Sequence, residues 1–184
     1  MSSRDFYIAD THFGHANAIK FDDRPFDSIE EHDAALISNW NSVVTEKDHV
    51  YILGDFCFKN ERPVSYYTSR LNGHLHLLRG NHDKRSEEYE SCFSSVDDIK
   101  EVVDYVNQVK VRVVLCYYWM PFYSQRKIML YGHTHKGKDY VLETEFKERM
   151  VSKGCPHYVY NVGAMFLGYF PRTLSEIMDA KRKA

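Results

Sequence analysis

The stretch His49-Val50-Tyr51-Ile52-Leu53-Gly54-Asp55 is a short apolar run that ends in glycine and aspartate. Such a run, closed by a turn signal, is typical of a buried β-strand. The same construction recurs along the chain: residues 6–9 lead into Asp10, residues 74–79 into Gly80, and residues 128–131 into Gly132. We therefore expect a set of strands that each deliver polar side chains at one end.

Helical patterns separate the first of these strands. Asp27 followed by Glu30 is a capping-box signal, and the apolar periodicity behind it predicts a helix over residues 28–43. A second helix is expected over residues 63–71, with Pro63 in its first turn, where proline is tolerated. Strands that alternate with helices in this way predict βαβ units, a central sheet and an α/β fold.

The second half of the chain has a different pattern. Two β-rich runs, residues 99–106 and 109–115, are separated by Asn107 and Gln108 and predict a hairpin. Further strands are expected over 158–162 and 166–169, and a terminal helix over 173–183. The polar stretch 136–153 is expected to be an irregular loop.

Length and charge restrict the class of protein. A chain of 184 residues suits a single domain over residues 1–184, with an ordinary hydrophobic core. The 24 basic and 26 acidic residues leave a net charge of -2, which argues against holding nucleic acid through bulk charge. The four cysteines have no paired spacing, and we expect buried, reduced thiols. There is no apolar leader and no run of membrane-spanning length, so we expect a cytoplasmic protein without a membrane partner. The sequence does not indicate the oligomeric state.

The ten histidines fall into two groups by position. One group lies in loops beside glycines or carboxylates, and we expect it to take part in a site: His12, His15, His82, His133 and His135. The other group lies within or next to regular segments, and we expect a structural or solvated role for it: His32, His49, His74, His76 and His157.

The polar residues at the strand ends form a set of metal ligands. Their side chains suit divalent transition metals or zinc: Asp10, His12, Asp55, Asn81, His133 and His135. Asp55 could bridge two ions, while the amide oxygen of Asn81 adds a ligand without adding charge. Two ions about 3.5–4 Å apart would activate a water and bind phosphoryl oxygens. The sequence therefore predicts phosphoester hydrolysis at a site with two divalent ions, which could be manganese, nickel, iron or zinc.

His82 is the candidate proton donor. Its position next to Asn81 places it at the site, where an imidazolium could protonate the leaving oxygen. Asp83 is expected to favour the charged form of the ring and to fix its orientation, so both residues are predicted to be catalytic. The alternative for His82 is a hydrogen bond that stabilises the loop.

In order and wording, the four motifs resemble those of the calcineurin-like metallophosphoesterases. They are Asp10-Thr11-His12, Gly54-Asp55, Gly80-Asn81-His82-Asp83 and Gly132-His133-Thr134-His135. The longer strings Asp10-Thr11-His12-Phe13-Gly14-His15 and Arg24-Pro25-Phe26 are similar to the small bacterial and phage branch. The resemblance runs from about Phe6 to Gly163 and implies a four-layer α/β/β/α sandwich.

The resemblance also implies a role for each matching residue. One ion would be held by Asp10, His12, Asp55 and His135. The other ion would be held by Asp55, Asn81 and His133, and His82 would be the leaving-group acid. We expect His15 and Arg24, which lie in the longer strings, to contact the substrate.

The sequence departs from the superfamily at Tyr117. The superfamily has a further histidine after the strand that precedes the final motif, and that histidine binds the second ion. Here the stretch reads Val114-Leu115-Cys116-Tyr117-Tyr118-Trp119-Met120-Pro121, with Tyr117 in the place of the histidine. A phenol, with a reference pKa of about 10, binds a divalent ion at neutral pH only if the ion helps to remove its proton. A weak second site, a tyrosinate ligand and impaired activity are all open.

Three functions compete on these grounds. The leading hypothesis is a metal-dependent hydrolase of phosphomonoesters or phosphodiesters, acting on a small phosphoester substrate. The rival is a catalytically impaired binding or scaffold protein on the same fold, like the retromer scaffold subunit of this superfamily. A nuclease is the third, since Asp10-Thr11-His12 is similar to the nuclease branch, but the near-neutral charge does not favour a nucleic-acid partner.

Overall fold

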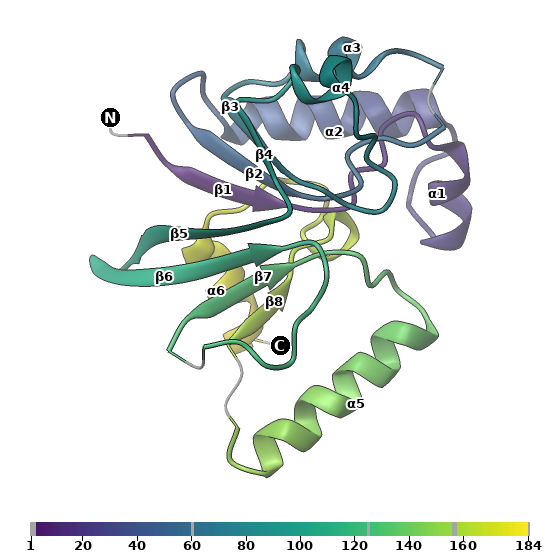
Figure 1. Ribbon diagram of the computed structural model, residues 1–184. Helices are drawn as coiled ribbons and strands as arrows, with labels where there is room; N and C mark the ends of the chain where they lie inside the picture. The colour runs from purple at the N-terminus through teal and green to yellow at the C-terminus, as the bar shows by residue number, and fades with distance from the viewer. Residues whose placement is uncertain (1–2, 60, 125, 156–157, 184) are drawn as a thin grey trace.

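The computed structural model describes residues 3–59, 61–124, 126–155 and 158–183. Two four-stranded sheets lie face to face (Figure 1). The first sheet is wholly parallel, in the order β1 (Asp5–Ile8), β2 (His49–Leu53), β3 (His74–Leu78) and β4 (Ser95–Asp97). The second sheet has the order β5 (Ile99–Val106), β6 (Val109–Cys116), β7 (Ile128–Tyr131) and β8 (Val159–Asn161). Its β5–β6 pair is the predicted antiparallel hairpin, and its other pairs are parallel.

Helices cover the outer face of the first sheet. They are α2 (Ile29–Val43), α3 (Val64–Thr68) and α4 (Glu87–Glu90), while α1 (Ala16–Phe21) lies at the end of that layer (Figure 1). Ser28 caps α2, because its hydroxyl accepts from the Glu31 amide, and Glu31 accepts from the Asp27 amide. The observed capping pair is therefore Ser28 and Glu31, one residue later than the capping box predicted at Asp27 and Glu30.

The strands of the first sheet are buried on both faces. In β1, the side chains of Phe6 and Ile8 pack under α2, whereas Tyr7 and Ala9 face the second sheet. Alternation along the strand sends successive side chains to opposite faces, and both faces are apolar because both are covered. The first sheet thus has one core against the helices and a second core against the other sheet. The helix α6 (Leu174–Lys183), which the sequence predicted, contributes Leu174 and Ile177 to the second core.

The outer face of the second sheet is covered differently. Met129, Tyr131 and Val159 form a small cluster there, packed by residues of the 116–123 segment. The stretch expected to be an irregular loop is the helix α5 (Lys138–Ser152), which stands away from the sheet (Figure 1). It is attached through Glu143, which accepts a hydrogen bond from Tyr131 and pairs with Lys147. Because α5 buries so little of its surface, its sequence carries no clear apolar period.

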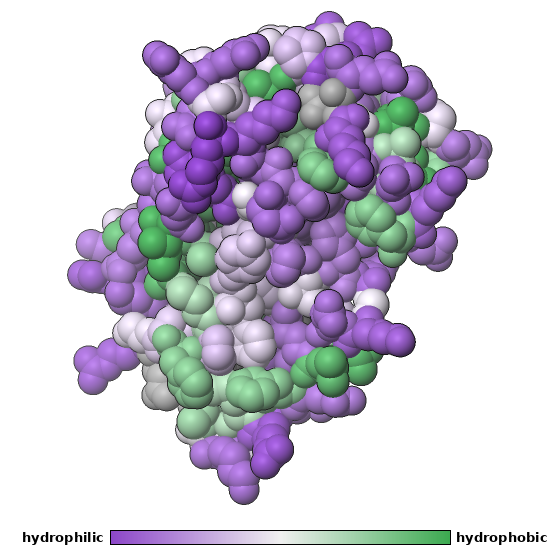
Figure 2. Space-filling model, turned by 45° about the vertical axis from the view of Figure 1, so that its right-hand side comes forward, coloured by the Kyte–Doolittle hydropathy of each residue, from purple (hydrophilic) through white to green (hydrophobic). Residues whose placement is uncertain are grey.

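Other expectations need smaller corrections. Residues 166–169 do not form a strand; a 3-10 helix, Ala164–Phe166, precedes Gly168, which has a φ of +66°. Cys57 is buried, but the other three cysteines are only half-buried. His157 lies outside the described residues. Figure 2 shows apolar side chains gathered at the end of the molecule where α5 lies, and those exposed on α5 are Val141, Leu142, Phe146 and Val151. Among the described helices, none combines the length and the apolar character that a membrane span requires.

Candidate metal centre

The four motifs meet at one edge of the two sheets. Asp10 follows β1, Asp55 follows β2, Asn81 follows β3 and His133 follows β7. The carboxyl ends of parallel strands lie at the same edge, and ligand sites in α/β sheets form there. The loops are joined by hydrogen bonds from the Asp10 amide to the Gly54 carbonyl, 3.0 Å, and from the His133 amide to the Asp10 carboxylate, 3.0 Å.

The backbone at this edge has an unusual conformation. Asp10, His12, Asp55 and His133 all have positive φ, at 54°, 51°, 50° and 69°. Each such non-glycine residue costs of the order of 1 kcal/mol and persists only where its surroundings hold it. Backbone strain of this kind concentrates at functional sites, and here it includes four of the six predicted ligands among nine such non-glycine residues of the described chain.

The glycines of the motifs make room for neighbouring groups. A Cβ on Gly80 would lie 2.3 Å from Oδ1 of Asp55, and one on Gly54 would lie 2.1 Å from Cδ2 of Tyr117. Any side chain at these two positions would displace a group of the site. The Gly-Asp and Gly-Asn pairs therefore reflect close packing of one loop on the next.

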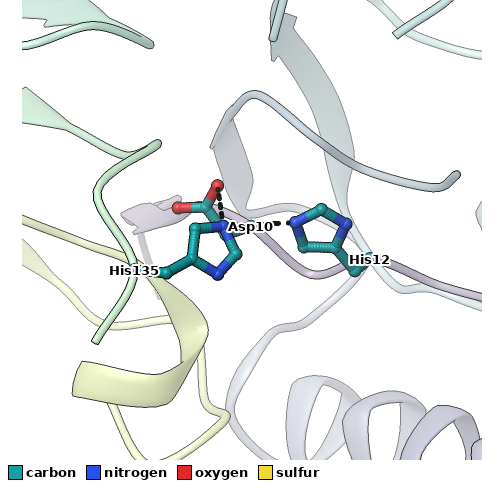
Figure 3. Close-up of side chains that lie close together, drawn as sticks. All are labelled: Asp10, His12 and His135. Carbon is teal, nitrogen blue, oxygen red and sulfur yellow. Dashed lines mark hydrogen bonds and ion pairs between the residues drawn. The ribbon is translucent and has the colours of Figure 1, made fainter. Parts of the chain in front are cut away.

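Three side chains form a cluster that could hold a metal ion: Asp10, His12 and His135 (Figure 3). Nε2 of His135 lies 3.4 Å from Oδ1 of Asp10 and 3.3 Å from Nε2 of His12. Oδ2 of Asp55 is 3.7 Å from Nε2 of His12 and adds a second carboxylate. Carboxylate oxygens and imidazole nitrogens converging on one point are the donor set of a divalent transition metal or zinc, so these residues fit an ion.

In each imidazole of the cluster, a second side chain contacts Nδ1, the ring nitrogen that faces away from the cluster. Nδ1 of His135 lies 2.7 Å from the carboxylate of Asp22, and Nδ1 of His12 lies 3.2 Å from Nδ1 of His15. Contacts of this kind leave Nε2 free for a metal and fix the plane of the ring. The sequence did not predict a role for Asp22, because the only indication of one is its position in the loop that contains Arg24.

Charges around the cluster set the protonation of its histidines. Burial lowers the pKa of His135, but hydrogen bonds and charges of Asp10 and Asp22 outweigh it and raise that pKa to about 9. Burial lowers the pKa of His12 well below its ordinary value, and the Arg24 charge adds to this effect. His12 is therefore neutral at ordinary pH, and a cation bound at the cluster would displace a proton from His135.

His15 and Arg24 lie close to the candidate metal ligands. The guanidinium of Arg24 is fully buried and binds Asp22, the backbone carbonyls of Asp10 and Thr11, and His32. His15 is buried against His12, and burial lowers its pKa to about 4. Neither residue is in the lining of the pocket, and both lie beneath the candidate metal ligands. Contact with a substrate stays a prediction for them.

The remaining predicted ligands surround the hydroxyl of Tyr117. That oxygen lies 2.6 Å from Oδ2 of Asp55, 2.9 Å from Oδ1 of Asn81 and 3.0 Å from Nδ1 of His133. Burial raises the pKa of Tyr117 far above its ordinary value, and the charges of Asp10 and Asp55 add to the rise. Burial also raises the pKa of Asp55, which hydrogen bonds from Tyr117 and the His82 amide oppose.

His82 faces the pocket, but Asp83 does not orient it. The ring of His82 stacks on Phe58, with centroids 3.8 Å apart, and its Nε2 lies 3.9 Å from Oδ2 of Asp55. The carboxylate of Asp83 accepts from the backbone amides of Asp55, Phe56 and Gly80 and from the Tyr89 hydroxyl. Asp83 therefore ties two loops together, and Phe58, which the sequence reading missed, positions the imidazole.

The site opens into a pocket of about 580 Å³. Asp55, Asn81, His82, Tyr117 and His133 form its floor together with His12 and His135, and Phe21 and residues 134–139 complete its lining. Phe21 is half exposed at the end of α1, with its ring 5.4 Å from that of His135. Lys136, Lys138 and Asp139 also line the pocket, so this segment adds two positive charges and one negative charge to it.

Comparison with known proteins yields partial matches. No protein-family model matches the chain. The uncharacterized protein MJ1445 of Methanocaldococcus jannaschii is 49% identical over 92 residues, which are 48% of this chain and 52% of that protein. The gene 66 protein of Mycobacterium phage L5 is 36% identical over 84 residues, 44% of this chain and 40% of that protein. The matches thus span about half or less of these relatives' own length.

Comparison with solved structures gives two matches, of which one supports a shared fold. AQ665 of Aquifex aeolicus, a protein of unknown function, superposes with a TM-score of 0.70 over 97% of this chain and 100% of its own, at 22% identity. This chain therefore shares its fold with AQ665. Pseudomonas putida nuclease MPE gives a TM-score of 0.46 over 71% of this chain and 60% of its own, at 23% identity, which is too distant to support an inference.

Proposed function

We propose that this protein is a metal-dependent hydrolase of phosphomonoesters or phosphodiesters. The observation that carries the proposal is the cluster of Asp10, His12 and His135, whose two histidines line an open pocket, with Asp55 beside it. A divalent ion held there would supply an activated water and neutralise charge on the phosphoryl oxygens. As part of the same proposal, we assign the chain to the calcineurin-like metallophosphoesterases, as one four-layer α/β/β/α domain of their small bacterial and phage branch.

The protein's own groups have distinct tasks in this proposal. His82 is about one-third exposed and stacked on Phe58, so it can donate a proton to a leaving oxygen that enters from the pocket. Lys136 and Lys138 attract the phosphate group. Asp22 and His15 keep the two imidazoles aligned, and Asp22 also raises the pKa of His135.

The substrate we propose is a small phosphoester in the cytoplasm. The pocket of about 580 Å³ accommodates a molecule of nucleotide size or smaller. With a net charge of -2, the chain offers little bulk attraction to a nucleic acid, so a nuclease activity is not favoured. A catalytically impaired scaffold protein is the second candidate, and the observation that favours it is Tyr117 at the centre of Asp55, Asn81 and His133.

The test is turnover of an aryl phosphodiester and an aryl phosphomonoester after removal of metal, with manganese, nickel, iron or zinc added back. We expect metal to restore activity in the wild type. His12→Ala should lose both bound metal and turnover. His74→Ala is the matched control, because His74 is an exposed histidine at the start of β3, outside the site. Full turnover in the presence of chelator would refute the proposal, and metal binding without turnover would favour the scaffold.

The dinuclear form of the proposal needs a second ion between Asp55, Asn81 and His133. Metal–ligand distances of about 2.0–2.2 Å would place that ion where these three side chains converge. The Tyr117 hydroxyl is in contact with all three. The number of ions therefore depends on what Tyr117 does.

A further inference from the structure

The ring of Tyr117 is fixed in its place. The residue follows β6, which ends at Cys116, and its side chain is 1% exposed. One face of the ring fills the space above Gly54, where a Cβ would lie 2.1 Å from Cδ2 of the ring. The rings of Tyr118 and His133 pack against it with centroids 4.8 Å and 5.0 Å away. These contacts prevent the side chain from turning its hydroxyl away from the site.

From this geometry we propose that the Tyr117 hydroxyl takes the place of a second ion, so that the site holds a single divalent ion. The inference rests on the proposed function, because that one ion is the ion assigned to Asp10, His12, Asp55 and His135. A bound ion would need its ligands at about 2.0–2.2 Å. The phenol oxygen, 2.6–3.0 Å from Asp55, Asn81 and His133, stands in the volume that such an ion requires.

The hydroxyl of Tyr117 has hydrogen-bond partners without a metal ion. A phenol has one proton, and it donates that proton to the Asp55 carboxylate, the nearest acceptor. In the tautomer that carries its proton on Nδ1, His133 donates a hydrogen bond to the phenol oxygen. Oδ1 of Asn81, 2.9 Å from the hydroxyl oxygen, is a second acceptor for the same proton. The hydroxyl therefore has hydrogen-bond partners in Asp55, Asn81 and His133 without an ion.

Tyr117 is thereby a positioning residue for Asp55. Oδ1 of Asp55 accepts from the His82 amide at 3.0 Å, and Oδ2 accepts from Tyr117 at 2.6 Å. The carboxylate is held from both sides, with Oδ2 3.7 Å from Nε2 of His12. Loss of a partner that orients a ligand commonly weakens metal binding by about 10- to 100-fold. The phenol thus supports the first ion while it excludes the second.

The test is the stoichiometry and affinity of manganese binding, by calorimetric titration of the metal-free protein and by electron paramagnetic resonance of the loaded protein. We expect one ion per wild-type chain, with the signal of an isolated ion. Tyr117→Phe keeps the ring and removes the hydroxyl, so it should bind its ion about 10-fold or more weakly. Tyr118→Phe is the matched control, because Tyr118 is half exposed beside the site, and its affinity should not change.

Tyr117→His is the complementary variant. It should bind two ions per chain and give the signal of a spin-coupled pair. Two ions in the wild type would overturn the inference, as would an unchanged affinity in Tyr117→Phe. A single ion in folded Tyr117→His would show that the hydroxyl is not what excludes the second ion, and would also overturn it. No bound ion in the wild type would instead refute the proposed function.

Discussion

Asp83→Asn should destabilise the protein by about 2 kcal/mol, and the value follows from four hydrogen bonds. Oδ2 of Asp83 accepts from the amides of Asp55 and Gly80, and Oδ1 accepts from the amide of Phe56 and the hydroxyl of Tyr89. An asparagine has only one oxygen, which we expect to face the two amides at Oδ2. Its NH₂ group then faces Tyr89, whose hydroxyl can rotate to accept, and the Phe56 amide, which cannot. One orphaned buried donor costs about 1–3 kcal/mol. Loss of the charge adds nothing to this, because burial raises the pKa of Asp83 and so already disfavours the charged form.

The assay is guanidinium unfolding in the presence of chelator, so that metal binding does not contribute to the measured free energy. Asp98→Asn is the matched control, because Asp98 is 60% exposed in its pairs with Arg79 and Arg85. That control should change stability by less than about 1 kcal/mol. If Asp83 instead acted on His82, Asp83→Asn would leave stability nearly unchanged and shift the pH profile of turnover. A loss below about 1 kcal/mol would therefore refute the role in joining the loops.

Three further predictions follow from individual contacts. His82→Ala should slow turnover by about 10²- to 10⁴-fold with unchanged metal content, and by less for a leaving group that needs no proton; equal losses for good and poor leaving groups would contradict the acid role. Because the pKa of His135 is raised to about 9, ion binding should release a proton below that pH and weaken as the pH falls; Asp22→Asn should reduce the release, measured by calorimetry in two buffers. Burial raises the pKa of Asp48, but hydrogen bonds from Arg4 and Thr45 outweigh this effect and lower that pKa to about 2. The charged Asp48 therefore stabilises the fold above about pH 4, and this stabilisation is lost as the pH falls through about 2. Asp48→Asn should cost about 2 kcal/mol at neutral pH, and a gap that persists at low pH in urea unfolding would contradict this origin.

The sequence predicted the strands and the gathering of the motifs for one physical reason. An apolar run that ends in Gly54-Asp55 specifies a buried strand and also places a carboxylate at its carboxyl end. Parallel pairing of β1, β2 and β3 then carries such groups to one edge. The spacing within Asp10-x-His12 and His133-x-His135 needed no tertiary information, because each pair lies in a single loop.

Adjacency in the sequence did not predict which side chains contact each other at the site. Asp83 follows His82, yet its side chain points to the backbone of the preceding loop, and Phe58, which is distant in sequence, stacks on His82. Arg24 was expected to contact the substrate because of the string in which it lies, yet its guanidinium is buried under the site. Loop backbone conformation decides such orientations, and no residue pattern encodes it locally. The helix α5 was missed for a different reason: only Glu143 of its 15 residues is buried, so its sequence shows no apolar stripe.

The scaffold holds the ligands before any ion arrives. Asp10 and Asp55 stay in left-handed conformations because their amides are hydrogen-bonded within the protein, to the Gly54 carbonyl and to the Asp83 carboxylate. The cost of ordering the ligands is therefore met by the fold and not by the metal. On the first-ion side this leaves Asp10, His12 and His135 converging on a point that a cation suits. On the other side the same preorganisation draws Asp55, Asn81 and His133 together around the Tyr117 hydroxyl. In the proposal made above, this hydroxyl takes the place of a second ion and supports the carboxylate of Asp55.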